Sequence, residues 1–320
     1  MAATATAPSR APARARPRAD SVRNWRLRQR VAFAAVWAAG LALCAIAVAI
    51  VGFMAVKGAQ YLDVQTVFSH PRPGVRQIDT GGILDPIEGT LVLTALALAL
   101  AVPLGVVTAL WVVEYGRPRA LARLVESGIE IVAGTPDIVI ALFGLALFQL
   151  PILGALSFTS SGGGVFGRSF FAAGTMLSLI ALPIVYTSVR EGLTAIPAQM
   201  REASWALGKT RICTIRAVLM PRLRRPIVTG SVLGMGRIIG DTAIVIILLG
   251  STPQISPENG PPVLGLLRGT GSTLTTFVYD ASPAGEGNAP QKAYAAAFVL
   301  LALVLIVNLA VDRLVGHERV

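Results

Sequence analysis

Long apolar stretches separated by short polar segments dominate the pattern along the chain. A helix needs about 20 apolar residues to cross a bilayer, and six stretches reach roughly that length: 31–56, 89–113, 129–150, 169–190, 226–250 and 293–315. The third and fifth contain Gly or Pro and the charged residues Asp137, Arg237 and Asp241, so their hydropathy is weaker. The pattern predicts an all-α integral membrane protein with six transmembrane helices.

Composition and charge support this prediction and add an orientation. Of the 320 residues 54% are hydrophobic and 14% are charged, with a mean hydropathy of +0.67, which is not the balance of a soluble globular domain. The net charge of +11 is mostly a topology signal, because 21 of the 28 Lys and Arg residues fall on one side of the six spans and six on the other. Positive residues concentrate on cytoplasmic flanks, so both termini are predicted to be cytoplasmic. Because topology accounts for most of the positive charge, the charge does not indicate nucleic-acid binding.

The chain is predicted to hold one membrane domain, residues 31–320. Residues 1–30 are rich in Ala, Pro and Arg and are predicted to form a disordered basic cytoplasmic tail that touches anionic lipid. The segments 57–88 and 251–292 are rich in Gly, Pro and Asp, which predicts irregular outer loops that could receive a partner.

One cytoplasmic connection, residues 191–225, is long for a link between two membrane helices. Its apolar residues recur at helical spacing and predict two short amphipathic helices that are separated at Gly208. Pro197 suits the start of the first helix and Pro221 a stop. We therefore expect this loop to do more than connect.

Within this loop, residues 203–210 read ASWALGKT and nearly match the phosphate-binding pattern G-x-x-x-x-G-K-[ST]. That pattern requires a Gly where Ala203 stands and a preceding strand, whereas the residues before it here have a helical pattern. ATP binding by this segment is therefore not expected.

Seven residues of the same loop make the sequence recognisable. Their spacing resembles the E-A-A-x-x-x-G-x9-I-x-L-P signature of permease subunits of bacterial ABC importers, in the binding-protein-dependent transport inner-membrane component family. The residues are Glu202, Ala203, Ser204, Gly208, Val218, Met220 and Pro221. The resemblance implies a type I ABC importer permease fold. It also implies that the loop forms a coupling helix, which sits on a cytoplasmic ATPase subunit and transmits nucleotide-driven closure to the membrane helices.

A narrower resemblance extends over most of the chain. It is carried by GGILDPIEGTLVLTALALALAVPLGVVTALWVVEYGRP, GTPDIVIALFG, ALPIVYTSVREGLTAIP and GRIIGDTA, at residues 81–118, 134–144, 181–197 and 236–243. These segments look like phosphate-specific permeases, and the C-terminal part looks like their A-type subunit. The resemblance implies a subunit that is not itself an enzyme and holds no cofactor. The implied partners are a second phosphate permease subunit, a cytoplasmic ATP-binding subunit dimer and an extracytoplasmic phosphate-binding protein.

Three positions depart from that phosphate-permease pattern. Asp241 stands where Glu is usual, which keeps the charge but shortens its reach by one methylene group. Thr187 stands near a position that often holds Arg, and Arg190 follows one helical turn nearer the cytoplasm. Asp137 stands where Ser is usual. The substrate path can therefore be rearranged relative to that of the family.

Arg237 and Asp241 are the candidate substrate-path residues. If the fifth span begins near Pro226, Arg237 lies about 16 Å into a hydrocarbon layer about 30 Å thick, where an unpaired charge is costly. Asp241 follows four residues later on the same helical face, so the two are predicted to neutralise each other within one helix. One interpretation is a structural ion pair. The other is that Arg237, whose planar fork suits phosphate oxygens, weakly receives an oxyanion, while Asp241 holds its charge when the site is empty.

Two functional alternatives stay open beside phosphate import. The same type of importer could carry another small oxyanion or polar solute, or the chain could be a stand-alone secondary transporter or a membrane-embedded enzyme. The 191–225 loop argues against the stand-alone alternatives, because neither needs an ATPase dock. The two histidines, His70 and His317, are solitary and suggest neither a metal site nor a hydrolase triad.

Overall fold

The computed structural model describes residues 19–71, 81–159, 164–252, 254–257, 261–283, 285 and 289–316. Across these residues the secondary structure is helical, apart from three isolated β-bridges. The elements are α1 (Ala19–Tyr61), α2 (Val64–Phe68), α3 (Leu84–Leu110), the π-helix η2 (Trp111–Tyr115), α4 (Arg119–Gly134), α5 (Asp137–Phe148), the 3-10 helix η3 (Pro151–Leu156), α6 (Phe170–Ala195), α7 (Ala198–Ala206), α8 (Arg211–Thr214), the π-helix η4 (Ile215–Leu219), α9 (Met220–Gly240), α10 (Ala243–Leu248), α11 (Pro262–Arg268), α12 (Leu274–Ala281) and α13 (Pro290–Gly316).

The chain divides into two compact units at residues 53 and 54. Within the described residues, the first unit is a single helix, the beginning of α1, with exposed apolar side chains from Val31 onward. Of the predicted disordered tail, residues 1–18 lie outside the described residues, and residues 19–30 belong to α1. The second unit holds the remaining elements.

Among the described residues, four helices are long and apolar enough to cross a membrane: Arg28–Tyr61, Leu84–Tyr115, Phe170–Ala195 and Pro290–Ala310. They coincide with the predicted first, second, fourth and sixth spans. The prediction worked for these four because each is a long apolar run that forms one helix and pairs most of its backbone polar groups within the segment.

The third predicted span, 129–150, is not one straight helix. It is formed by α4 and α5, which meet at 108° and count together as a fifth possible span. The break falls at Thr135 and Pro136, both with extended backbone (ψ 132° and 138°). Proline disfavours the helical conformation of the residue before it, so the bend follows from the local sequence.

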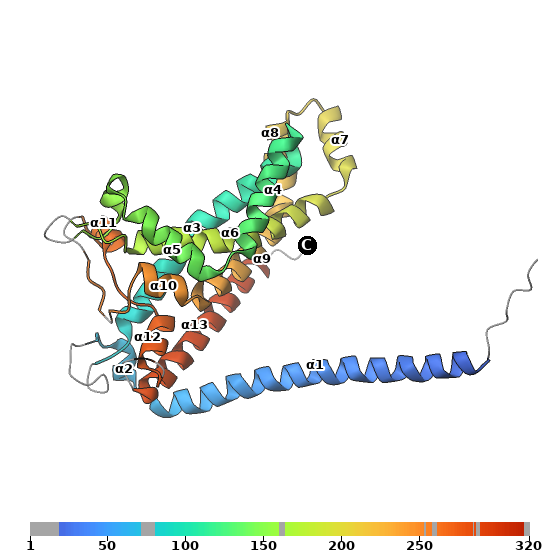
Figure 1. Cartoon of the computed structure of the whole chain (residues 1–320). Helices are drawn as coiled ribbons and strands as arrows, with labels where there is room; N and C mark the ends of the chain where they lie inside the picture. The colour runs from blue at the N-terminus through green and yellow to red at the C-terminus, as the bar shows by residue number, and fades with distance from the viewer. Residues whose placement is uncertain are drawn as a thin grey trace, which may run out of the picture. The chain divides into compact units, whose positions relative to one another are not determined.

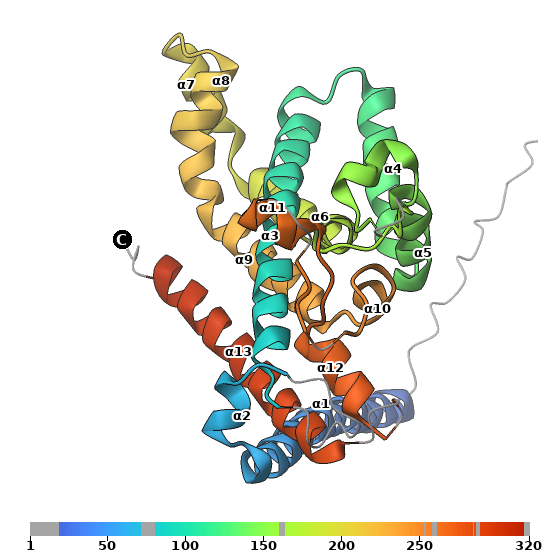
Figure 2. The same ribbon diagram turned by 90° about the vertical axis from the view of Figure 1, so that its left-hand side faces the viewer.

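The fifth predicted span, 226–250, is also broken, and it begins earlier than expected. Pro221 does not stop a helix: η4 runs directly into α9, and Pro221 is the second residue of α9. The helix ends at Gly240, Asp241 is extended (ψ 132°), and α10 begins at Ala243. Figure 1 shows α10 as a short separate helix beside α5, and Figure 2 shows the same arrangement from the side.

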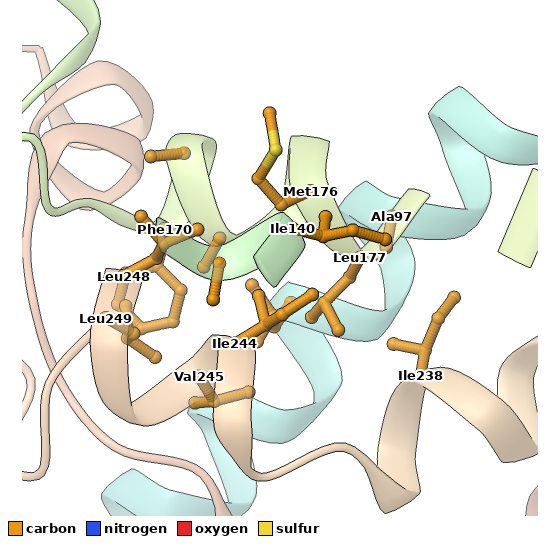
Figure 3. Close-up of a cluster of buried hydrophobic side chains, with 14 of the residues drawn as sticks. Ala97, Ile140, Phe170, Met176, Leu177, Ile238, Ile244, Val245, Leu248 and Leu249 are labelled. Carbon is orange, nitrogen blue, oxygen red and sulfur yellow. The ribbon is translucent and has the colours of Figure 1, made fainter. Parts of the chain in front are cut away.

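The core of the second unit is built from α3, α6 and α9, with α5 and α10 packed beside α6. Leu248 and Leu249 lie beside Phe170, while Ile244 faces Leu177 (Figure 3). Because lipid tails are as apolar as these side chains, close van der Waals packing is what stabilises the cluster. Their packing holds α10 in place although the break separates it from α9.

Candidate functional site

One face of α9 packs against α6 and the opposite face is open. A Cβ on Gly230 would lie 3.0 Å from the Ser188 Cβ, and one on Gly234 would lie 3.4 Å from the Ala181 Cβ, so these two glycines permit close helix packing. A Cβ on Gly236 or Gly240 would meet no described residue outside its own helix within 4 Å. The glycines of α9 thus form two pairs: Gly230 and Gly234 on the packed face, and Gly236 and Gly240 on the open face.

Arg237 lies on this open face of α9, between Gly236 and Gly240 and one turn after the exposed Leu233. Its side chain is 43% exposed, and it belongs to the last turn of the helix. A basic side chain in the last turn is favoured by the partial negative charge of the helix C-terminus. The arginine is thus accessible rather than enclosed in the helix packing.

The ion-pair partner of Arg237 is Asp137, not Asp241. Nη2 of Arg237 donates to both carboxylate oxygens of Asp137, the first residue of α5. The predicted pairing within one helix was wrong because α9 ends at Gly240, so Asp241 no longer occupies the helical position four residues after Arg237. The two partners are 100 residues apart in sequence.

Asp241 instead organises the break between α9 and α10. Its side chain is buried, 4% exposed, and its Oδ2 accepts a hydrogen bond of 2.8 Å from the backbone N–H of Ile244. Thr275 donates to the backbone carbonyl of Asp241 over 3.2 Å. The carboxylate therefore satisfies one of the N–H groups that the start of α10 leaves without a partner.

A small cavity next to Asp241 is lined by hydroxyl groups from two distant segments. Thr90 and Thr94 come from α3, and Thr273 and Thr275 from the start of α12. The hydroxyl of Thr90 accepts from the Leu274 N–H at 2.9 Å, which joins the two segments. The sequence interpretation did not single out these threonines, because they are separated by about 180 residues and match no motif.

The 191–225 loop forms the first predicted short helix as α7, whereas the second, α8, continues through η4 into α9 instead of stopping at Pro221. Pro197 precedes α7 and Gly208 separates α7 from α8. Gly208 has a φ of +75°, a left-handed conformation that glycine adopts without the strain imposed by a side chain. After α8 the chain runs through η4 directly into α9, so Met220 and Pro221 are the first residues of the membrane helix. In Figure 2, α7 and α8 lie at the far end of α9.

The signature residues of this loop divide into exposed and structural ones. Glu202 and Ala203 are exposed, and so are the apolar side chains of Trp205 and Leu207, at 45% and 78%. Ser204 is buried, with its hydroxyl 2.8 Å from that of Thr214 in α8. This hydrogen bond joins α7 to α8. The exposed side chains of Trp205 and Leu207 form an apolar surface on the loop.

An arginine of the same loop ties it to the end of α3. Arg201 donates from Nε to Glu114 in η2 at 2.9 Å, and from its two other nitrogens to the carbonyls of Ile196 and Leu193, each at 2.9 Å. The side chains of Arg201 and Glu114 are only 15% and 11% exposed. Neither residue was among the predicted site residues, although both are charged residues at the ends of predicted elements.

The remaining departures from the phosphate-permease pattern also have defined places. Thr187 donates to the Pro183 carbonyl of its own helix at 2.8 Å. Arg190 pairs with Glu126 of α4 at 2.8 Å, so it joins α6 to α4. Among the described residues no group of three or more His, Cys, Asp or Glu side chains could hold a metal ion.

Several helices long and apolar enough to cross a membrane, an exposed arginine beside a helix break, and a two-helix loop projecting from the bundle are the features of a multi-pass membrane permease. The chain belongs to the family described as binding-protein-dependent transport system inner membrane component, whose model matches residues 101–319. The family and the fold predicted from the sequence are confirmed.

Similar proteins of known name are permeases. The phosphate transport system permease protein PstA 1 of Mycobacterium tuberculosis (strain CDC 1551 / Oshkosh) is 34% identical over 72% of this chain and 69% of its own length. The phosphate transport system permease protein PstC of Xylella fastidiosa (strain 9a5c) is 30% identical over 71% and 69%. The probable ABC transporter permease protein YqgH of Bacillus subtilis (strain 168) is 32% identical over 76% of each chain.

Solved structures share the fold. A bacterial alginate ABC transporter matches with a TM-score of 0.56 and 17% identity, over 92% of this chain and 95% of that chain. An inward facing conformation of the MetNI methionine ABC transporter matches with a TM-score of 0.54 and 20% identity, over 75% and 95%. At these identities the likeness concerns the fold alone.

Proposed function

We propose that the chain is one of two permease subunits of an ATP-driven importer of inorganic phosphate and forms half of its translocation path. The observation that carries the proposal is Arg237, a permanently charged side chain on the open face of a membrane helix. Guanidinium binds phosphate oxygens in pairs and keeps its proton. The names of the phosphate permeases that this chain resembles support phosphate as the substrate.

The open face of α9 suits a path that two subunits line together. It presents Leu233, Gly236, Arg237 and Gly240, and the described residues of this chain do not cover them. In this proposal the second phosphate permease subunit lies opposite that face. Residues 31–320 form the transmembrane domain, residues 1–30 a cytoplasmic tail near lipid, and both termini are cytoplasmic.

The 191–225 loop is the proposed contact with a dimer of cytoplasmic ATP-binding subunits, which hydrolyse ATP in place of this chain. Glu202, Ala203, Trp205 and Leu207 supply the exposed surface of that contact. Ser204 and Gly208 shape the loop, and Met220 and Pro221 pass its movement directly into α9. An extracytoplasmic phosphate-binding protein delivers the substrate on the other side.

Phosphate uptake in a strain that lacks its own phosphate permeases tests the substrate and the site. We expect radiolabelled phosphate uptake with the unaltered chain, little competition from sulfate, and uptake reduced at least tenfold by Arg237→Gln, since a lost charged contact is worth about 1.5–3 kcal/mol. Strong competition by sulfate would indicate that the transported substrate is an oxyanion other than phosphate. Unchanged uptake by Arg237→Gln would leave the arginine with a structural role only.

The ATPase contact has its own test. Glu202→Lys reverses an exposed charge without entering the loop's interior, and Gly208→Asp places a side chain at a left-handed position. We expect less ATP-binding subunit to co-purify with either variant, or ATP hydrolysis that no longer depends on substrate. A matched control is Arg216→Gln, an exposed charge change in the same loop. Normal co-purification and coupling in both variants would exclude this surface as the contact.

A further inference from the structure

The ion pair between Arg237 and Asp137 is open, in contrast to a pair that is buried to hold helices together. The two side chains are 43% and 25% exposed. The arginine comes from the last turn of α9 and the aspartate from the first residue of α5. A small molecule that reaches the open face of α9 therefore reaches this pair.

A carboxylate and a phosphate group present the same feature to a guanidinium group, namely two negatively charged oxygens that accept parallel N–H donors. Asp137 already presents both of its oxygens to Arg237. Asp137 thus accepts hydrogen bonds from the Arg237 guanidinium group in the same way that an oxyanion would.

From this arrangement we propose that Asp137 is a built-in competitor for the transported anion and sets how weakly Arg237 binds it. This inference rests on the proposed function, in which Arg237 lines the path. In the empty transporter Asp137 neutralises the arginine, and a phosphate ion binds there only when it displaces the carboxylate. Asp137, one of the three positions that depart from the phosphate-permease pattern, is then a specificity and affinity determinant.

Packing shows that α5 does not need this ion pair as an attachment. Ile140, Ala141 and Phe148 of α5 are buried in the core cluster with α6 and α10. Gly144 lets α5 approach Met176 closely, because a Cβ there would lie 2.9 Å from the Met176 sulfur. The helix is thus held along its length by apolar contacts, and the carboxylate at its first residue is available for another role.

The position of Asp137 also allows its carboxylate to separate from Arg237. It directly follows the break at Thr135 and Pro136, where α4 and α5 meet at 108°. Among the residues described for α4 only Ile129 is buried, so this helix is less constrained than α5. A change of the Asp137 side-chain rotamer separates its carboxylate from Arg237 while the buried part of α5 stays packed.

The competition has a measurable consequence. A ligand that binds only the unpaired arginine has its apparent dissociation constant raised in inverse proportion to the unpaired fraction. If the pair is formed about nine-tenths of the time, its removal strengthens phosphate binding about tenfold.

The test uses the complete importer, purified in lipid nanodiscs without the extracytoplasmic binding protein, and measures equilibrium binding of radiolabelled inorganic phosphate. We expect Asp137→Asn and Asp137→Ser to bind phosphate about tenfold more tightly than the unaltered complex. Asp137→Glu restores the carboxylate and keeps the weak binding. Adding Arg237→Gln to Asp137→Asn abolishes the gain, because the gain belongs to the freed arginine.

Binding that is unchanged or weaker in both neutral variants overturns the inference. So does failure of both neutral variants to assemble while Asp137→Glu assembles, since the pair would then be structural. The proposed function fails separately: if Arg237→Gln leaves phosphate uptake intact, Arg237 is not on the path. If Arg237→Gln abolishes uptake while Asp137→Asn leaves binding unchanged, the path stands and only the competition is excluded.

Discussion

Arg201 of the 191–225 loop is held against Glu114 at the end of α3 by a hydrogen-bonded ion pair of 2.9 Å. The same guanidinium donates to two backbone carbonyls at the end of α6. One side chain therefore joins the projecting loop to two membrane helices. A displacement of the loop acts on both helices at once.

Arg201→Gln is expected to weaken this junction. It removes the charge and at least one of three hydrogen bonds, and it leaves Glu114 largely buried without its partner, which costs about 1–3 kcal/mol. We expect a lower melting temperature of the purified permease and ATP hydrolysis that is poorly coupled to transport. Arg216→Gln, which changes an exposed charge in the neighbouring η4, serves as the control. Equal melting temperatures for the two variants would contradict the role given to Arg201.

The hydrogen bond between Ser204 and Thr214 predicts an asymmetric response to mutation. Thr214 also donates to the Thr210 carbonyl at 3.1 Å, so Ser204→Ala leaves the threonine with a partner. Thr214→Val removes the hydroxyl group to which the buried Ser204 hydroxyl is hydrogen-bonded, at a cost of about 1–3 kcal/mol. We expect a clear loss of thermal stability for Thr214→Val and a change below about 1 kcal/mol for Ser204→Ala. The reverse order would contradict the assigned hydrogen bonds.

The two glycine pairs of α9 predict opposite outcomes for the same substitution. Gly230→Ala brings a methyl group within 3.0 Å of the Ser188 Cβ and 3.1 Å of the Val185 Cα, so α9 and α6 must separate, which costs about 1–3 kcal/mol. Gly236→Ala meets no described atom outside its helix within 4 Å and gains helix propensity of about 1 kcal/mol. The measurement is the melting temperature of each variant, Gly230→Ala and Gly236→Ala, as an isolated permease in detergent. A destabilised Gly236→Ala would show that the α9 face is covered within this chain.

The contact between His70 and Asp85 predicts a pH-dependent segment. Nδ1 of the exposed histidine lies 2.5 Å from the Asp85 carboxylate, whose other oxygen accepts from the Ile255 N–H at 3.1 Å. The hydrogen bond to Asp85, followed by the negative charges of Asp85 and Glu88, raises the pKa of His70 above its ordinary value of 6.5. The added stability is therefore fully present below about pH 6.5 and is lost as the pH rises through the raised pKa.

Amide hydrogen exchange of α2 measures this effect after correction for the intrinsic pH dependence of exchange. We expect protection of residues 64–68 to fall as the pH rises above about 6.5 and through the raised pKa of His70 in the unaltered chain, because the His70 charge disappears there. His70→Gln keeps a polar side chain and should remove the pH dependence. A pH dependence that persists in His70→Gln would assign the effect to another group.

How much the sequence could predict depended on whether a feature was local. The four unbroken spans were predicted because apolar length alone determines them. Gly208 and the two helices beside it were predicted because a glycine at a helix end is a local signal. Pro221 was misinterpreted as a stop because a proline in the first turn of a helix looks the same in the sequence as a proline after a helix.

The features that the sequence could not predict depend on contacts between distant residues. The spacing of Arg237 and Asp241 indicated one helical face, and it failed because the helix ends between them. Nothing in the local sequence pairs Arg237 with Asp137, since that contact depends on how α5 packs against α6 and α10. The sequence placed Asp137, Arg237 and Asp241 in predicted spans, but only Asp241 was predicted as the partner of Arg237.

The break between Gly240 and Ala243 has one more consequence. The first N–H groups of α10 and the last carbonyls of α9 lack partners within their own helices, and the carboxylate and Thr275 satisfy only some of them. In hydrocarbon such groups are tolerated only where protein or water reaches them. Asp241, Ile244 and Val245 are buried, so the surrounding protein rather than lipid faces this break, and Arg237 is the exposed charged group beside it.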